Sequence, residues 1–282
     1  MPTLHLRKSS AINSLTKAEV SVFRALWQYR HFVLAMIRGE LKARLARSYI
    51  GAGWFILQPL AQALIFTMVL SEGLGARLPN VENKYAYAAF VLSGMSAWGF
   101  FSEIVNRSIT IFTDYGSTLK KIAFPRLCLP VIVLGTALVN HAMVLMATMV
   151  LCCLFGYYPS VTWLTLPLGI VLVAALGFGI GLIFGVFNVF SRDVGNAFGV
   201  ILQIWFWLTP IAYPPEALPD AVRAMLDKNP MTSVVNIYHD ALLRNQWPDP
   251  AGLIFPSIVS VGFLFSALFL FRRSSSELVD AL

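Results

Sequence analysis

Long runs of apolar residues alternate with short polar segments along most of this chain. Six of these runs approach the length of about 20 mostly apolar residues that a helix needs to cross a bilayer. The runs cover about residues 51–71, 87–107, 128–155, 162–187, 196–212 and 252–271. The third and fourth are long enough to cross with a tilt, and the fifth is short. The pattern predicts an all-α polytopic membrane protein, with residues 1–282 forming a single membrane domain.

A different pattern precedes the first run, where apolar residues recur at helical spacing with basic residues between them. The apolar positions are Phe23, Leu26, Trp27, Val33, Leu34, Ile37 and Leu41. Such a stripe predicts an N-terminal amphipathic helix, over about residues 18–48, that lies in the membrane interface. The helix is either a simple anchor or a gate that also contacts a partner, and the pattern leaves both open.

The distribution of charge predicts the topology. Only 12% of the residues are charged and 57% are hydrophobic, whereas a soluble domain has about 25% charged residues. The N-terminal segment, alternate loops and the C-terminal tail hold 16 Lys and Arg residues, and the other loops hold 5. By the positive-inside rule both termini of this multi-pass protein are expected to lie in the cytoplasm. The net charge of +7 is thus a topology signal, and no nucleic-acid partner is expected.

A proline-rich segment follows the fifth run. Its prolines break the helix, and two short helical patterns follow at about 219–228 and 230–245. The charge count places residues 213–251 on the periplasmic side, and we expect them to re-enter toward a pore mouth, because irregular backbone at membrane depth must be buried in protein or line a cavity.

Aromatic residues gather near this segment and in the earlier runs. They form either an interfacial belt or a surface for substrate, because their flat apolar faces with polar tips suit a sliding amphiphilic polymer. The candidates for the substrate channel are Trp54, Trp98, Phe101, Trp205, Trp207 and Tyr213.

Polar and small residues inside the runs are the remaining candidates for function or packing. Gly177, Gly181 and Gly185 stand four residues apart, which predicts close helix packing. Glu103 is the one acid well inside a run, and Arg107 follows one helical turn later. Polar residues at such positions either serve function or form hydrogen bonds between helices. The full set is Gln58, Gln62, Glu103, Asn140, His141, Asn188 and Gln203.

The chain shows no pattern for catalysis. No GxxxxGK[ST] motif occurs, so ATP and Mg²⁺ are expected on another subunit and no cofactor is expected in this chain. The His residues are scattered, so neither a metal site nor an enzyme active site is expected. Cys128, Cys152 and Cys153 are interpreted as small core residues.

Four stretches resemble the permease subunits of ABC-2 type polysaccharide exporters, the class that handles O antigen, capsule and teichoic acid. They are LKARLARSYIGAGWFILQP (41–59), LKKIAFPRLCLP (119–130), SRDV (191–194), and LTPIAYPPEALP with NPM (208–219 and 229–231). The chain departs from the family pattern at Leu45, where an aromatic residue is common, and at His239-Asp240, where Tyr-Arg is frequent.

This resemblance implies a channel-forming homodimer that works with two ABC ATPase subunits and exports a lipid-linked polysaccharide. It also implies a coupling helix between the second and third spans that docks into the ATPase. On that basis the ATPase-coupling residues are Lys120, Lys121, Phe124, Pro125 and Arg126. The alternatives are an ABC-2 exporter of a drug or small lipid, an ion-coupled secondary flippase, and a membrane scaffold without a substrate.

Overall fold

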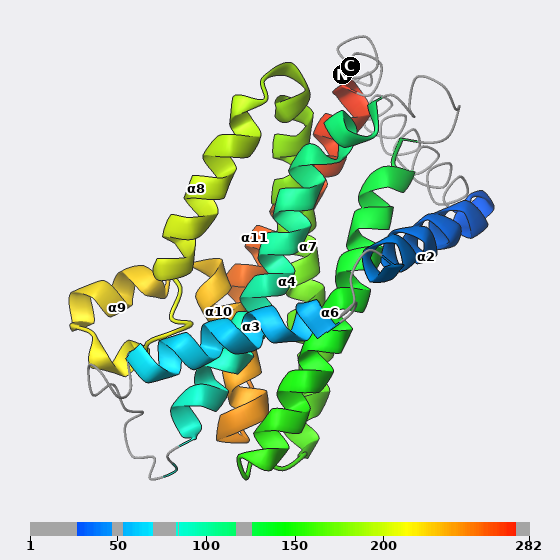
Figure 1. Cartoon of the computed structure of the whole chain (residues 1–282). Coiled ribbons are helices and arrows are strands. Elements are labelled where there is room, and N and C mark those ends of the chain that lie inside the picture. The colour runs from blue at the N-terminus through cyan, green and yellow to red at the C-terminus, as the bar shows by residue number, and fades with distance from the viewer. Residues whose placement is uncertain (1–26, 47–52, 70–82, 84, 117–125, 275–282) are drawn as a thin grey trace, which may run out of the picture.

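The protein is a helical bundle, seen here in a computed structural model that describes residues 27–46, 53–69, 83, 85–116 and 126–274 (Figure 1). These residues contain no β-strand. In chain order the helices are α2 (Arg30–Ala46), α3 (Gly53–Phe66), α4 (Ala86–Asp114), α6 (Cys128–Leu154), η2 (Val161–Thr165), α7 (Leu166–Phe190), α8 (Asp193–Trp207), η3 (Pro215–Ala217), α9 (Asp220–Leu226), α10 (Pro230–His239), η4 (Asp240–Arg244) and α11 (Pro250–Ser274).

Four described helices are long and apolar enough to cross a membrane. They are α4, α6, α7 together with η2, and α11, and they overlap the second, third, fourth and sixth predicted runs. Among the described residues the first and fifth runs form shorter helices, since α3 has 14 residues and α8 has 15. At a rise of 1.5 Å per residue, helices of this length cover roughly 21–23 Å, which is less than the 30 Å hydrocarbon core. Figure 1 shows α3 lying across α4 and α6.

Helix α4 forms the centre of the bundle and is the most enclosed of the four long helices. It packs most extensively on α7 through the three glycines at four-residue spacing. A Cβ added at Gly181 would lie 2.6 Å from the Ser108 Cβ, and one at Gly185 would lie 2.5 Å from the Ser108 carbonyl oxygen. At Gly177 the nearest atoms, at 3.3 Å, belong to Ile104 and Phe101. The missing side chains therefore allow the two backbones to approach closely.

The chain after α8 turns back onto the bundle through α9, α10 and η4. Both short helical patterns expected from the sequence are present, at Asp220–Leu226 and over Pro230–Arg244. Helix α10 packs against α4, α7 and α11. Its apolar face is buried, and the residues that form it with η4 are Val234, Val235, Ile237, Tyr238, Ala241 and Leu242.

Asn229 holds the start of α10 in place. Its side-chain oxygen accepts hydrogen bonds from the Met231 N–H at 3.0 Å and from the Trp205 Nε1–H at 2.9 Å. Its amide nitrogen donates to the Leu208 carbonyl at 2.9 Å and to the Thr209 hydroxyl at 3.0 Å. One side chain thus joins the end of α8 to the first turn of α10, which is where an N-cap residue satisfies free backbone N–H groups.

Helix α2 covers part of the interface helix expected at 18–48, of which residues 18–26 and 47–48 lie outside the described part of the chain. It packs on α6 through Val33 and Ile37, and the Ile37 side chain lies against Gly135. Trp27 and Leu34, which were grouped with Val33 in one apolar face, are exposed in this chain. The contact with α6 therefore uses only part of the predicted apolar stripe.

Candidate functional site

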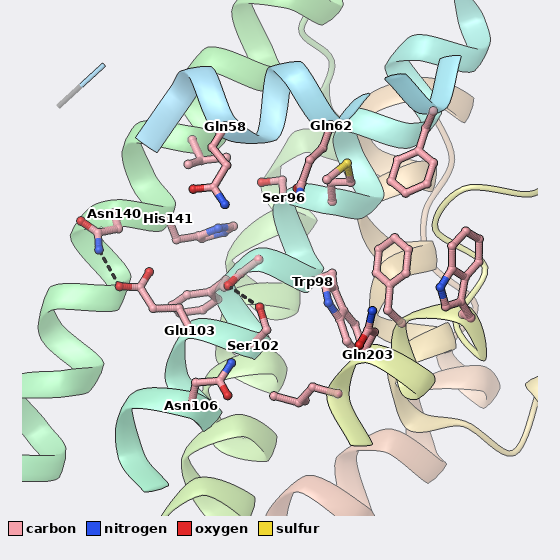
Figure 2. A pocket seen from close by; sticks show the side chains of 18 residues that line it. Gln58, Gln62, Ser96, Trp98, Ser102, Glu103, Asn106, Asn140, His141 and Gln203 are labelled. Carbon is pink, nitrogen blue, oxygen red and sulfur yellow. Dashed lines mark hydrogen bonds between the residues drawn. The ribbon is translucent and has the colours of Figure 1, made fainter. Parts of the chain in front are cut away.

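A cavity of about 680 Å³ lies between four helices that come from distant parts of the chain. Figure 2 shows the side chains of the 18 residues that line it. Helix α3 lies above the cavity, α6 on the left, α4 in the middle and α8 on the right. Its volume falls within the range of roughly 300–1,000 Å³ that is typical of ligand sites. We call this cavity the α3–α4–α8 groove.

The lining of the groove combines apolar and aromatic side chains with a group of polar ones, although the surrounding helices are apolar. Six of the seven intramembrane polar residues singled out in the sequence meet here. They are Gln58 and Gln62 of α3, Glu103 of α4, Asn140 and His141 of α6, and Gln203 of α8. The seventh, Asn188, instead donates to the Ile109 carbonyl at 3.0 Å and accepts from the Gly195 N–H at 2.9 Å, so it joins α7 to α4 and α8.

Three further polar residues line the groove and were not predicted from the sequence, namely Ser96, Ser102 and Asn106. All three belong to α4, and with Glu103 they follow helical spacing along one face of that helix (Figure 2). A helix of this kind carries a polar stripe within an apolar sequence. That periodicity was the signal that could have found them.

Glu103 connects the groove to two neighbouring groups. Its carboxylate accepts a hydrogen bond from the Asn140 amide at 2.6 Å (Figure 2) and lies 3.8 Å from the Arg107 guanidinium. The ion pair that the sequence suggested between Glu103 and Arg107 is therefore present. Because a carboxylate is costly to bury in an apolar environment, these donors explain how it is held there.

His141 connects the groove to α10. Its ring stacks on Phe100, with 4.4 Å between ring centroids, and its Nε2 lies 3.1 Å from the Tyr238 hydroxyl. Tyr238 is fully buried. His141, in the part of the groove wall formed by α6, therefore directly contacts α10, the helix that follows the proline-rich segment.

A second polar cluster joins α2 to the bundle through Glu40. The Glu40 carboxylate accepts hydrogen bonds from the Arg107 guanidinium, from the Tyr115 hydroxyl at 2.8 Å and from the Thr136 hydroxyl at 3.1 Å. Burial, and then the hydrogen bond to Glu40, raise the pKa of Tyr115 to about 12, so the phenol stays protonated and donates. Since Arg107 also approaches Glu103, the cluster and the groove share one chain of charged groups.

The predicted channel aromatics lie in three settings. Trp98 and Trp207 line the groove. Trp205 packs edge-on against Trp98 and Phe101, with centroid distances of 6.4 and 5.2 Å, and Phe101 itself has no exposed surface.

Tyr213 and Trp54 lie apart from that cluster. The Tyr213 hydroxyl donates to the Trp207 carbonyl at 2.7 Å. Trp54 is exposed on α3 and is not part of the groove lining. The structure therefore brings Trp98 and Trp207 to the groove wall and uses Phe101 and Trp205 as packing behind it.

The predicted ATPase-coupling residues are mostly outside the described part of the chain. Lys120, Lys121, Phe124 and Pro125 belong to the range 117–125, which the structure does not describe. Arg126 is described and lies partly exposed just before α6. Among the described residues, no three His, Cys, Asp or Glu side chains lie close enough to hold a metal ion.

Comparisons with known proteins agree on one family. Residues 31–243 match the family model described as ABC-2 type transporter. The chain is 29% identical over 267 residues to the O-antigen export system permease protein RfbA of Myxococcus xanthus, which covers 93% of this chain and 100% of that protein. It is 24% identical over 206 residues to a Klebsiella pneumoniae O-antigen export permease, covering 73% and 77% of the two chains. It is also 24% identical over 250 residues to the Escherichia coli polysialic acid transport protein KpsM, covering 88% and 95%.

Proposed function

The chain belongs to the ABC-2 type transporter family, and from this we propose that it is the channel-forming membrane subunit of an ATP-driven exporter for a lipid-linked polysaccharide. Its cargo would pass from the cytoplasm to the periplasm or the outside. The curated relatives are named for O-antigen export and for polysialic acid transport, and both names refer to glycans.

The polar groove is the observation that carries this proposal. It offers amide, hydroxyl and carboxylate groups on α3, α4, α6 and α8 next to the ring of Trp98 and the exposed Trp207. Sugars present hydroxyl groups at their edges and C–H groups on their faces, and these match hydrogen-bonding side chains and aromatic rings respectively. A purely apolar cargo would leave the Gln58, Gln62 and Gln203 amides without partners, which costs free energy in a low-dielectric site.

The working unit in this proposal is a homodimer. A second copy of the chain would close the groove into a channel, and the first and fifth apolar runs, which contain α3 and α8, would be the two further spans. The 16-to-5 distribution of Lys and Arg supports cytoplasmic termini and an inner-membrane location.

Energy would enter through two copies of a separate ABC ATPase that binds ATP and Mg²⁺. The proposed contact is the segment with Lys120, Lys121, Phe124, Pro125 and Arg126, which directly precedes α6. A rigid-body movement there would shift α6 and, through it, Asn140 and His141 in the groove. Phe124→Ala and Lys121→Glu should lower the coupled ATPase activity of the complex. Unchanged coupled activity in both variants would refute this contact.

The export proposal is tested in a strain that lacks the chain and carries a plasmid copy. The double variant Gln62→Leu/Gln203→Leu removes two groove amides, each worth about 1 kcal/mol as a hydrogen bond, so surface glycan should fall roughly thirtyfold. Gln246→Leu is the matched control, because Gln246 is exposed and does not line the groove. Membrane levels of all variants are measured by immunoblot.

The same strain separates the alternatives. Surface glycan that is unaffected by loss of the chain would refute glycan export and favour a drug or small lipid as cargo. Export that persists when the partner ATPase is inactivated, and stops when the proton gradient is collapsed, would favour an ion-coupled flippase.

A further inference from the structure

A second pocket of about 320 Å³ lies between α10 and the beginning of α11. It shares no lining residue with the α3–α4–α8 groove. Its lining includes carboxylate, hydroxyl and amide side chains, and its apolar residues include Ile237, Leu253 and Phe255. We call it the α10–α11 pocket. The polar side chains used below are Asp227, Thr232, Asn236, Asp240 and Asp249.

Two buried oxygen atoms in this pocket lack hydrogen-bond partners among the described residues. They are the Thr232 hydroxyl oxygen and the Asn236 side-chain carbonyl oxygen. Thr232 is only 4% exposed. Buried polar atoms without partners are rare in folded proteins, and a group that donates hydrogen bonds into the pocket would satisfy both atoms.

The pocket also carries negative charge, of which only the exposed Asp227 carboxylate lacks a partner among the described residues. It contains three carboxylates and no Lys, Arg or His. Two of the carboxylates already have donors. Asp240 accepts from Arg244 at 3.0 Å, and Asp249 caps α11 by accepting from the Ala251 and Gly252 N–H groups at 3.1 Å. The Asp227 side chain has no hydrogen-bond or ion-pair partner in the described part of the chain. A ligand here is therefore expected to be cationic as well as a hydrogen-bond donor.

The spacing of the acids favours an organic cation over a bare metal ion. No three acidic or other ligating side chains of the described residues converge closely enough to hold a metal. The volume instead matches the lower end of small-molecule sites, at roughly 300 Å³. We propose that the α10–α11 pocket binds a ligand with a primary ammonium group, which pairs with the Asp227 carboxylate and donates to Thr232 and Asn236.

Two ligands share this chemistry. One is an amino sugar, as part of a glycan at the outer end of the bundle. The other is the headgroup of an aminophospholipid, because Ile254 and Ile258 continue from the pocket as exposed apolar residues along α11. The inference does not rest on the export proposal, since it concerns binding to the chain itself.

The test uses the full-length chain in nanodiscs of phosphatidylglycerol, titrated with glucosamine and, in parallel, with N-acetylglucosamine. Acetylation removes the positive charge and leaves the sugar ring intact. Lipid binding is measured by native mass spectrometry on chain extracted from an equal mixture of phosphatidylethanolamine and phosphatidylcholine. Phosphatidylcholine is the control lipid, because its headgroup has no N–H donor. The variants are Asp227→Asn and Thr232→Val, which keep side-chain size.

Preferential binding of glucosamine would identify an amino-sugar site, and preferential retention of phosphatidylethanolamine would identify a headgroup site. In either case each variant should weaken binding about tenfold. Asp220→Asn is the control, since Asp220 is on α9 outside the pocket and should leave binding unchanged. Equal binding of the acetylated sugar and of phosphatidylcholine, no binding of any probe, or variants that bind like the wild type would each overturn the proposal. None of these outcomes bears on glycan export.

Discussion

The Glu40 carboxylate makes polar contacts that join α2 to the bundle, and its removal should destabilise the protein measurably. The side chains of Arg107 and Glu40 are 21% and 15% exposed, so the pair is only partly accessible to water. Truncating one partner of a buried pair costs about 3–5 kcal/mol. Glu103 remains 3.8 Å from Arg107 and retains part of its pairing, so we expect Glu40→Ala to cost about 3 kcal/mol, at the lower end of that range.

A double-mutant cycle separates this pairing from other effects of truncation. Glu40→Ala and Arg107→Ala, alone and together, should show a coupling free energy of about 1.5–2 kcal/mol. Each single variant leaves the other charged side chain without this partner, whereas the double variant removes both members of the pair. Unfolding is followed in mixed micelles by tryptophan fluorescence as the fraction of denaturing detergent rises. Arg38→Ala, on the exposed side of the same helix, is the control and should change stability by less than about 0.5 kcal/mol. A coupling within 0.5 kcal/mol of zero would refute the assignment of Arg107 as the partner of α2.

Three further predictions concern packing and titration. Gly181→Ala should destabilise the chain by about 1–3 kcal/mol, since its Cβ would meet Ser108, whereas Gly262→Ala, with no atom within 4 Å, should be neutral or stabilising in the same unfolding assay. Asn188→Leu should cost about 1–3 kcal/mol, because it removes the hydrogen bond to the Ile109 carbonyl and leaves the Gly195 N–H in the first turn of α8 without its acceptor; equal stability would contradict that role. The raised pKa of Tyr115 stabilises the fold below pH 10, and this contribution is lost as pH rises from 10 to 12. Tyr115→Phe should therefore reduce the fall in stability over that window. An equal fall in the variant would refute this contribution of Tyr115.

The apolar pattern predicted the long helices well because length and hydropathy decide whether a segment can cross a membrane. It was less informative for α3 and α8, since the first run reached the expected length and the fifth was short, and their described parts form helices of 14 and 15 residues. Hydropathy does not report where a helix ends when neighbouring segments are also apolar. The six-span count therefore stays a prediction.

The groove was partly visible in the sequence. An amide or acid within an apolar run is costly unless it finds partners, so Gln58, Glu103 and Gln203 stood out individually. Their meeting in one cavity depends on how α3, α4 and α8 cross, which no local pattern encodes.

The contacts of two residues that join helices, Asn229 and Glu40, were not predicted from the sequence. Asn229 entered the sequence analysis only within the NPM stretch at 229–231, and the structure shows four hydrogen bonds on its side chain. Glu40 was not singled out, although it is the one acid in the basic helix α2. A lone acid among basic residues was a signal for a specific partner, but that partner, Arg107, lies 67 positions away in the chain.

The enclosure of α4 has a consequence for how the chain is made. This helix has the lowest mean hydropathy of the four long ones, 1.4 against 2.0–2.7, and 78% of its most apolar window is covered by protein. During synthesis it precedes α6 and α7, which provide that cover, because they follow it in the chain. The ion pair between Glu103 and Arg107 is internal to α4 and can form at that stage. The Glu103 charge in α4 is thus compensated within the same helix, and the centre of the bundle is complete only when the glycine face of α7 packs against α4.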